Sequence, residues 1–292
     1  MGFRDEFAAI TQTRQPLSSF THLRIGGPAE YLVTPRTRDE LGRVVGACAA
    51  EKIPVRVLGV GTNIVVRDEG VAGAVIRLTA PEFTRVSVTG KTVKSGGGAT
   101  VYSLISAATL AGLAGFETLV GITATVGGAL RFNAGDRSGE IADHLVRVEV
   151  IDSAGRFVVR ERGDIRFGEH ESDLDDPVVL GVEFALEADD PDAIGKRMRR
   201  AWINRKAEQP LSHQAAVRVF RNPHGQSASQ LLERAGLVRA RVGAAEVSDR
   251  NANYIVAQPG TKAADVIALA HKMRAGVKAA LGVSLEQELK VW

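Results

Sequence analysis

The spacing of apolar and polar residues predicts short strands that alternate with helices over the first two-thirds of the chain. Residues 29–33 are β-prone and stop before Pro35. Thr37, followed three residues later by Glu40, has the capping-box pattern of a helix start. Residues 100–111 carry apolar side chains at helical spacing. Further strands are predicted over 55–58, 71–78 and 178–186, and hairpins over 85–94 and 145–160.

The last third of the chain predicts a second part. A basic helix over 190–206 leads to Gln209-Pro210, where a domain boundary is expected. Beyond it we expect a helix over 227–235 ended by Gly236, a strand near Tyr254, and an amphipathic helix that stops at Gly282. The fold class is therefore α+β in two parts. The basic helix fits phosphate binding, but its acidic N-terminal end suits the helix dipole and favours a solvated linker.

Composition excludes several classes of protein. The chain has 292 residues, 45% hydrophobic and 24% charged, which is ordinary for a globular protein. No apolar run reaches the roughly 18 residues of a membrane helix, and the N-terminus lacks a signal peptide, so we expect a cytoplasmic location without membrane association. Cys48 is the single cysteine, and no metal-ligand spacing is present. A net charge of +3 gives no reason to expect nucleic acid as a partner.

Glycine clusters are the strongest chemical signal in the sequence. Glycine adopts positive φ and lets main-chain amides approach a pyrophosphate. Neither common phosphate motif is present, since Ile64 stands where the dinucleotide fingerprint needs glycine and the loop has no lysine. Each cluster alone is more often a tight turn, but four at successive strand ends favour one extended ligand. The clusters lie at 26–27, 59–63, 96–98 and 121–135.

Several motifs, in this order and spacing, resemble the UDP-N-acetylenolpyruvoylglucosamine reductase family. They cover nearly the whole chain, at 24–29, 58–63, 125–129, 133–135, 138–141, 219–223, 227–228, 243–248, 252–254 and 285–288. The resemblance implies a FAD-binding domain of the vanillyl-alcohol-oxidase/PCMH type over 1–190, with subdomains of about 1–80 and 81–190. It further implies a linker helix over 191–210, a C-terminal substrate domain over 211–292, and a monomer.

The resemblance also implies non-covalent FAD, because no histidine or cysteine lies in an evident attachment motif. The cofactor-binding residues that it implies are Arg24, Gly59, Val60, Gly61, Thr62, Asn63, Gly98, Gly121, Thr125, Gly127, Gly128, Asn133 and Ile141.

In this family NADPH reduces the flavin, which passes hydride to the enolpyruvyl ether of a UDP-sugar, while a serine delivers a proton. Glu288 falls on the glutamate that assists the proton transfer, although alone it would be interpreted as a surface carboxylate. Asn222, Arg221 and Ser172 fall on substrate-binding positions, and Asn222 before Pro223 equally suits a turn.

The catalytic positions depart from the family pattern. Arg218 stands where the serine is expected, and Glu169-His170 replaces a Tyr-Arg pair in which the arginine holds the substrate carboxylate. Arginine stays protonated and cannot serve as an ordinary proton donor. The catalytic candidates are therefore Glu288, Arg218, His170 and Glu169. His213 and His224 flank the altered segment, but loop histidines are more often solvated than catalytic.

Three interpretations of these departures stay open. In the first, an active reductase obtains its proton from water, His170 or Glu288. In the second, the site acts on another substrate in specialised metabolism. In the third, the protein binds flavin without turnover.

Overall fold

The computed structural model describes residues 2–136, 138–210, 215–223 and 225–292, so His213 and His224 lie outside the described residues. The chain divides into two compact units. Unit 1 contains Met1–Thr13, Glu30–Gly59 and Ala72–Arg205, and unit 2 contains Arg14–Ala29, Val60–Val71 and Lys206–Trp292. Two early segments, Arg14–Ala29 and Val60–Val71, thus belong with the C-terminal part of the chain. The linear domain limits expected from the sequence stay a prediction.

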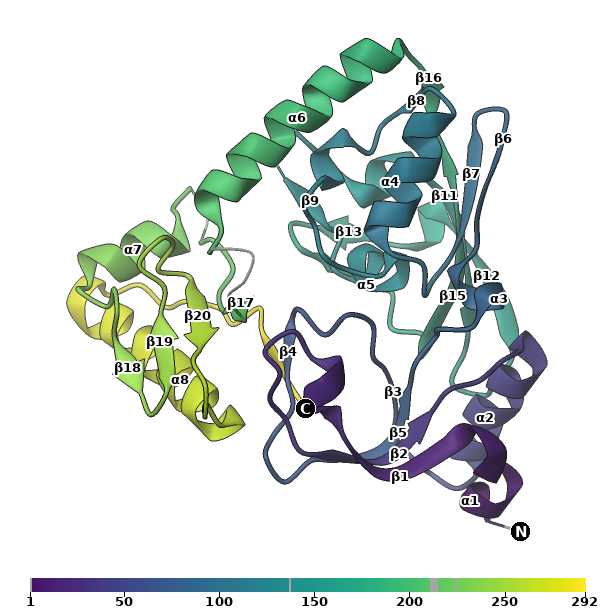
Figure 1. Cartoon of the computed structure of the whole chain (residues 1–292), viewed down its shortest axis with the longest axis horizontal. Coiled ribbons are helices and arrows are strands. Elements are labelled where there is room, and N and C mark those ends of the chain that lie inside the picture. The colour runs from purple at the N-terminus through teal and green to yellow at the C-terminus, as the bar shows by residue number, and fades with distance from the viewer. Residues whose placement is uncertain (1, 137, 211–214, 224) are drawn as a thin grey trace. The chain divides into compact units, whose positions relative to one another are not determined.

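The first sheet, most of which belongs to unit 1, has strand order β1-β2-β5-β3 (Figure 1). Its strands are β1 (Thr11–Pro16), β2 (Pro28–Val33), β5 (Val71–Ile76) and β3 (Val55–Val57), and β3 runs parallel to β5. Helix α2 (Arg38–Ala50) packs Leu41 and Val44 into the core of this sheet. Thr37 caps the helix by accepting a hydrogen bond from the Glu40 amide at 3.2 Å, as the sequence predicts.

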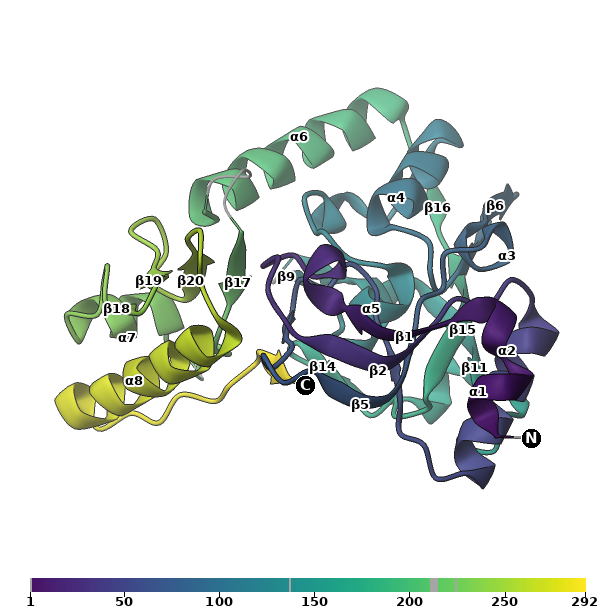
Figure 2. The ribbon, with the colours of Figure 1, turned by 60° about the horizontal axis from the view of Figure 1, so that its bottom comes forward.

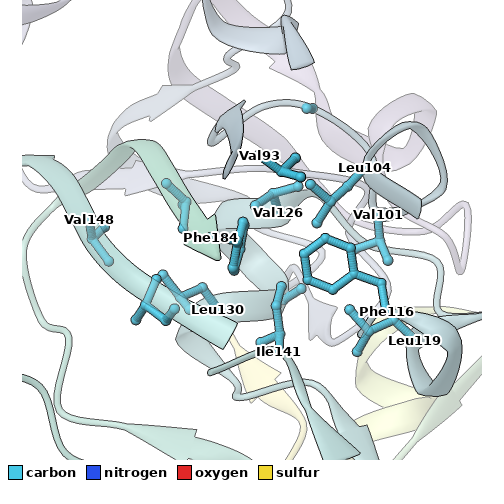
Figure 3. Close-up of a cluster of buried hydrophobic side chains, with 14 of the residues drawn as sticks. Val93, Val101, Leu104, Phe116, Leu119, Val126, Leu130, Ile141, Val148 and Phe184 are labelled. Atoms are coloured by element: carbon cyan, nitrogen blue, oxygen red, sulfur yellow. The ribbon is translucent and has the colours of Figure 1, made fainter. Parts of the chain in front are cut away.

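The second sheet of unit 1 has five antiparallel strands in the order β12-β11-β15-β7-β6. These are β12 (Phe157–Glu161), β11 (Leu145–Ile151), β15 (Val178–Ala185), β7 (Thr92–Gly96) and β6 (Val86–Thr89). Helices α4 (Val101–Leu110) and α5 (Val126–Arg131) cover it. Figure 3 shows buried side chains of the hydrophobic core in this part of unit 1. Among them, the Phe116 and Phe184 rings pack edge to face with their centroids 5.1 Å apart. Helix α6 (Pro191–Glu208) follows.

Unit 2 contains a four-stranded sheet with two helices (Figure 2). Its strand order is β17-β20-β19-β18, made of β17 (Ala216–Arg218), β20 (Tyr254–Ala257), β19 (Ala245–Val247) and β18 (Arg241–Val242). Helix α7 (Ala228–Arg234) and helix α8 (Ala263–Leu281) pack on this sheet, and α8 ends at Gly282 with φ 73°. Strands β4 (Ile64–Val65) and β21 (Lys290–Val291) form a separate parallel pair within the unit.

Shorter elements complete the described chain. They are the helices α1 (Phe3–Glu6) and α3 (Pro81–Thr84), the 3-10 turns η1 (Ala8–Ile10), η2 (Leu17–Phe20), η3 (Glu117–Leu119), η4 (Ile141–His144) and η5 (Arg162–Asp164), and the strand pairs β8 (Leu113–Ala114) with β16 (Glu187–Ala188), β9 (Gly135–Asp136) with β10 (Gly139–Glu140), and β13 (Phe167–Gly168) with β14 (Glu171–Ser172). None of the helices in the described residues combines the length and apolarity needed to span a membrane.

Candidate functional site

The loop 58–63 follows strand β3, and its glycines allow two close approaches of the main chain. A Cβ atom on Gly59 would lie 2.6 Å from Thr125 Oγ1, so only glycine fits against the start of α5. In unit 2, Gly61 has φ +71°, and a Cβ there would lie 2.9 Å from the Phe20 carbonyl oxygen. The His22 amide donates to the Gly61 carbonyl oxygen at 3.1 Å. At both places a side chain on the glycine would collide with its neighbours, so close packing of the loop requires glycine.

A second main-chain wall in unit 1 is formed by the clusters 96–98 and 121–128. The Gly127 amide donates to the Gly97 carbonyl oxygen at 2.9 Å. A Cβ on Gly98 would lie 2.0 Å from the Leu78 carbonyl oxygen. Thr125 caps α5 by accepting from the Gly128 amide at 3.3 Å. Gly121 has φ +84°, and a Cβ there would lie 3.0 Å from Arg205 Cδ.

Glycine-rich main chain of this kind is typical of segments that hold a pyrophosphate, and in this structure the Gly127 and Gly128 amides are engaged within unit 1. Within the described residues, no group of three or more His, Cys, Asp or Glu side chains is placed to hold a metal ion.

Asn133 and Ile141 are buried in unit 1. Ile141 is fully buried in the hydrophobic core, and its amide donates to the Ala134 carbonyl oxygen at 2.8 Å. The Nδ2 atom of Asn133 donates to Glu140 and, at 3.0 Å, to the Gly168 carbonyl oxygen. Among the described residues the buried Oδ1 of Asn133 has no hydrogen-bond partner. Their predicted cofactor contacts remain a proposal.

Glu169 and His170 form the turn between β13 and β14, where Gly168 pairs with Glu171. His170 is half-buried and has φ 56°, in the left-handed region that few non-glycine residues adopt. Glu169 is exposed. Ser172 donates its hydroxyl proton to the Arg131 carbonyl oxygen at 2.9 Å, which docks this turn on the end of α5.

Arg218 and Glu288 meet in unit 2. Arg218 Nε lies 3.4 Å from Glu288 Oε2, and their side chains are 25% and 10% exposed. Glu288 is therefore buried and not the surface carboxylate that a terminal position alone suggests. Its amide donates to the Val219 carbonyl oxygen at 2.9 Å, which fixes the C-terminal segment beside the end of β17.

Two neighbouring candidates have structural partners in unit 2. Arg221 Nη1 lies 3.3 Å from Glu286 Oε1, a second ion pair beside the first. Asn222 Oδ1 accepts from the Ala228 amide at 3.0 Å, so it orders the loop before α7. This contact fits the turn interpretation of Asn222.

Asn253 and Asp68, which lie outside the predicted site residues, have structural roles in unit 2. The buried side chain of Asn253 accepts from the Phe220 amide at 3.0 Å and donates to the Phe220 carbonyl oxygen at 2.7 Å. Asn253 thereby holds the main chain directly after the strand that ends at Arg218. The motif 252–254 is the only sequence feature that points to Asn253. Asp68 accepts from the Ala263 and Ala264 amides at 2.9 and 3.0 Å, at the start of α8. No local pattern connects residues so far apart in sequence.

Burial also shifts two pKa values near these segments. The pKa of His22 is lowered by burial and by the positive charge of Arg24. Burial likewise lowers the pKa of Arg131, and Asp176 opposes that shift. Arg24 is exposed and has φ 55°, in the segment that packs against Gly61. His22 is thus a neutral side chain beside the glycine loop at neutral pH.

The fold and these main-chain walls define a FAD-binding protein with a separate C-terminal domain. Residues 29–160 match the FAD binding domain model, and residues 209–292 match the model of the UDP-N-acetylenolpyruvoylglucosamine reductase C-terminal domain. The chain belongs to the UDP-N-acetylenolpyruvoylglucosamine reductase family of FAD-dependent oxidoreductases. The predicted fold class and family are confirmed.

Relatives match over nearly the full length. The crystal structure of the reductase from Thermus caldophilus has a TM-score of 0.84 and 39% identity, and the match covers 97% of this chain and 98% of that one. The protein named UDP-N-acetylenolpyruvoylglucosamine reductase 2 from Symbiobacterium thermophilum is 41% identical over 95% of this chain and 91% of its own length. The reductase from Moorella thermoacetica is 38% identical over 96% of this chain and 92% of its own length.

Proposed function

We propose that this protein reduces the enolpyruvyl ether of a UDP-sugar, UDP-N-acetylenolpyruvoylglucosamine, with hydride taken from NADPH through FAD. The observation that carries the proposal is the near full-length similarity to reductases of that name, in a chain that keeps the glycine main-chain walls. Monomeric state and cytoplasmic location remain predictions that belong to the same proposal.

The main chain of 59–63 and 121–128 would hold FAD, with the amides of Gly127 and Gly128 and the Thr125 cap ordering that wall. FAD, when bound there, would supply the chemistry of hydride transfer between the nicotinamide and the acceptor. The predicted contacts of Arg24 and Asn133 are part of this proposal.

The residues proposed for the substrate are Arg218, Arg221, Asn222 and Glu288 in unit 2, with Glu169, His170 and Ser172 in unit 1, each set being proposed within its own unit. A proton must reach the substrate carbon after hydride addition. Arg218 holds its proton too tightly to give it up, and the Ser172 hydroxyl already donates to a carbonyl oxygen. Water, His170 or Glu288 would deliver the proton.

The Arg218–Glu288 ion pair favours a second candidate, a flavoenzyme of this family that acts on another anionic acceptor. A guanidinium in this position changes the charge that the site presents to its substrate. A flavin-binding protein without turnover is the third outcome to be tested.

The decisive experiment uses the purified protein with its flavin. We expect a yellow protein that releases intact FAD on acid denaturation, because the cofactor is not covalently attached. Anaerobic NADPH should bleach the flavin, with NADH in a parallel sample to establish the preferred donor. Adding UDP-N-acetylenolpyruvoylglucosamine should then restore the flavin colour and give a product two hydrogen atoms heavier by mass spectrometry.

Each failure has a different meaning. A colourless protein that FAD does not reconstitute contradicts the cofactor assignment. A flavin that NADPH never bleaches indicates the protein without turnover. A bleached flavin that this acceptor does not reoxidise, in the absence of oxygen, indicates the second candidate with another substrate.

A further inference from the structure

The side chain of Arg218 has one polar partner and an otherwise uncommitted guanidinium. Its Nε faces Glu288 Oε2 at 3.4 Å. Within the described part of the chain no hydrogen bond engages its Nη1 or Nη2 atoms, and a quarter of the side chain is exposed. A guanidinium presents its nitrogen atoms as a planar fork that matches a carboxylate. Arg218 is therefore held by the protein through Nε, and its Nη1 and Nη2 atoms can bind an anion.

The side-chain carboxylate of Glu288 forms an ion pair with Arg218. The residue is 8% exposed, and its buried Oε2 accepts no hydrogen bond among the described residues. A buried carboxylate oxygen without a hydrogen bond is unfavourable unless a cation lies nearby, and Arg218 is that cation. The carboxylate in turn restricts where the guanidinium can point.

The main chain fixes both partners. Arg218 is the last residue of β17 and pairs with Tyr254 of β20. Val219, the next residue, accepts hydrogen bonds from the Glu288 and Leu289 amides at 2.9 and 3.2 Å. Phe220 is held on both its amide and its carbonyl by Asn253. Arg218 thus ends a paired strand, and main-chain hydrogen bonds to Val219 fix Glu288 beside it.

We infer that Arg218 anchors the carboxylate of the acceptor and that Glu288 is the positioning residue that orients it. The inference rests on the proposed function, because the enolpyruvyl group carries a carboxylate on the carbon that accepts the proton, next to the carbon that accepts hydride. The turn at His170 is a poorer carboxylate site, since the exposed Glu169 stands next to the histidine. In this chain the cation for the acceptor is supplied by unit 2.

The test measures binding of UDP-N-acetylenolpyruvoylglucosamine to the oxidised holoenzyme by calorimetry, without NADPH, and then steady-state kinetics. Removing a charge-assisted hydrogen-bond pair in Arg218→Gln should weaken Kd and raise KM by about 10- to 100-fold, with a smaller fall in kcat. Arg218→Lys keeps the charge but not the fork, and should lie between wild type and Arg218→Gln. The matched control is Arg239→Gln, which removes an exposed arginine paired with Asp249 at 2.9 Å in the same unit.

Glu288→Gln distinguishes positioning from an independent contact. If Glu288 acts through Arg218, Glu288→Gln weakens binding in the wild type but adds nothing in the Arg218→Gln background. Additive effects would overturn the positioning role. An unchanged Kd in both Arg218→Gln and Arg218→Lys would overturn the anchor, as would an Arg218→Ser variant that gains kcat without a rise in KM.

The readouts separate this inference from the proposed function. Wild type that turns over the acceptor while Arg218→Gln keeps its KM refutes the anchor and leaves the reductase standing. Wild type that binds the acceptor without turnover refutes the reductase, and the Kd of Arg218→Gln still decides on the anchor. Wild type that does not bind the acceptor at all refutes both.

Discussion

Replacing Gly59 by alanine tests whether the loop after β3 needs glycine because of Thr125. The added Cβ would lie 2.6 Å from Thr125 Oγ1 and 3.1 Å from its Cγ2. Thr125 is β-branched and cannot simply turn away, since its hydroxyl oxygen caps α5 through the Gly128 amide. Overpacking of this kind costs about 1–3 kcal/mol, which lowers Tm by roughly 2–4 °C for each kcal/mol in a domain of this size.

A double-mutant cycle isolates the cause. Thr125→Ala removes both clashing atoms and should itself cost about 1 kcal/mol through the lost cap. Its remaining Cβ would lie at 3.4 Å, an ordinary contact. The double variant Gly59→Ala, Thr125→Ala should therefore be no less stable than Thr125→Ala alone, instead of showing the sum of both losses.

Urea denaturation of the FAD-free protein gives these free energies of unfolding, and flavin titration gives the FAD affinity of each variant. Gly195→Ala is the control, because nothing lies within 4 Å of a Cβ there. Within helix α6 that change should raise stability by about 0.5–1 kcal/mol. Strictly additive losses in the cycle would refute the explanation of Gly59 by contact with Thr125.

Two further predictions concern stability and reactivity. Burial, assisted by the charge of Glu51, raises the pKa of Cys48 from 9.0 to about 12, so a disulfide reagent at pH 8 should label this thiol only after unfolding. Because the folded protein keeps a proton that the unfolded chain loses, this group should lower stability as pH rises from about 9 to 12; rapid native labelling would contradict the prediction. Asp68→Ala removes the acceptor of two amides at the start of α8 and should lower the free energy of unfolding by about 1–2 kcal/mol in urea titration. The exposed neighbour Glu69→Ala should leave it within about 0.5 kcal/mol, and equal losses in both variants would refute the capping role.

Local patterns in the sequence predicted local structure well. The cap at Thr37 and the hairpin turn at Gly90 follow from residues within a few positions of each other, and the structure has both. The same holds for the end of α8 at Gly282, where only a residue tolerant of positive φ fits. In these places the determining contacts lie within one turn of the chain.

The glycines of the candidate site were harder to interpret from sequence. Positive φ at Gly61 and Gly121 agrees with a bend, but Gly97 and Gly98 are glycines because a Cβ would strike the main chain of Val179 and Leu78. That requirement depends on strands that come together only in the folded unit. A sequence pattern does not separate a glycine needed for a ligand from one needed for packing.

The Arg218–Glu288 pair was equally hidden. The sequence shows a cation at one position and a carboxylate near the end of the chain, but not that main-chain hydrogen bonds to Val219 bring Arg218 Nε and Glu288 Oε2 within 3.4 Å of each other. The sequence also does not show that Glu288 is buried. Because a buried carboxylate needs a nearby cation, Glu288 is the partner of an arginine and not a solvated charge near the chain end.

The parallel pairing of β4 with β21 limits how this protein can be cut into independently folding pieces. A fragment of residues 209–292 alone would lose the strand partner of Lys290–Val291 and the carboxylate on the first turn of α8, both contributed by 64–68. Its exposed strand edge and uncapped helix would favour self-association. Autonomous folding of residues 209–292 therefore requires the segment 64–68 to be joined to them.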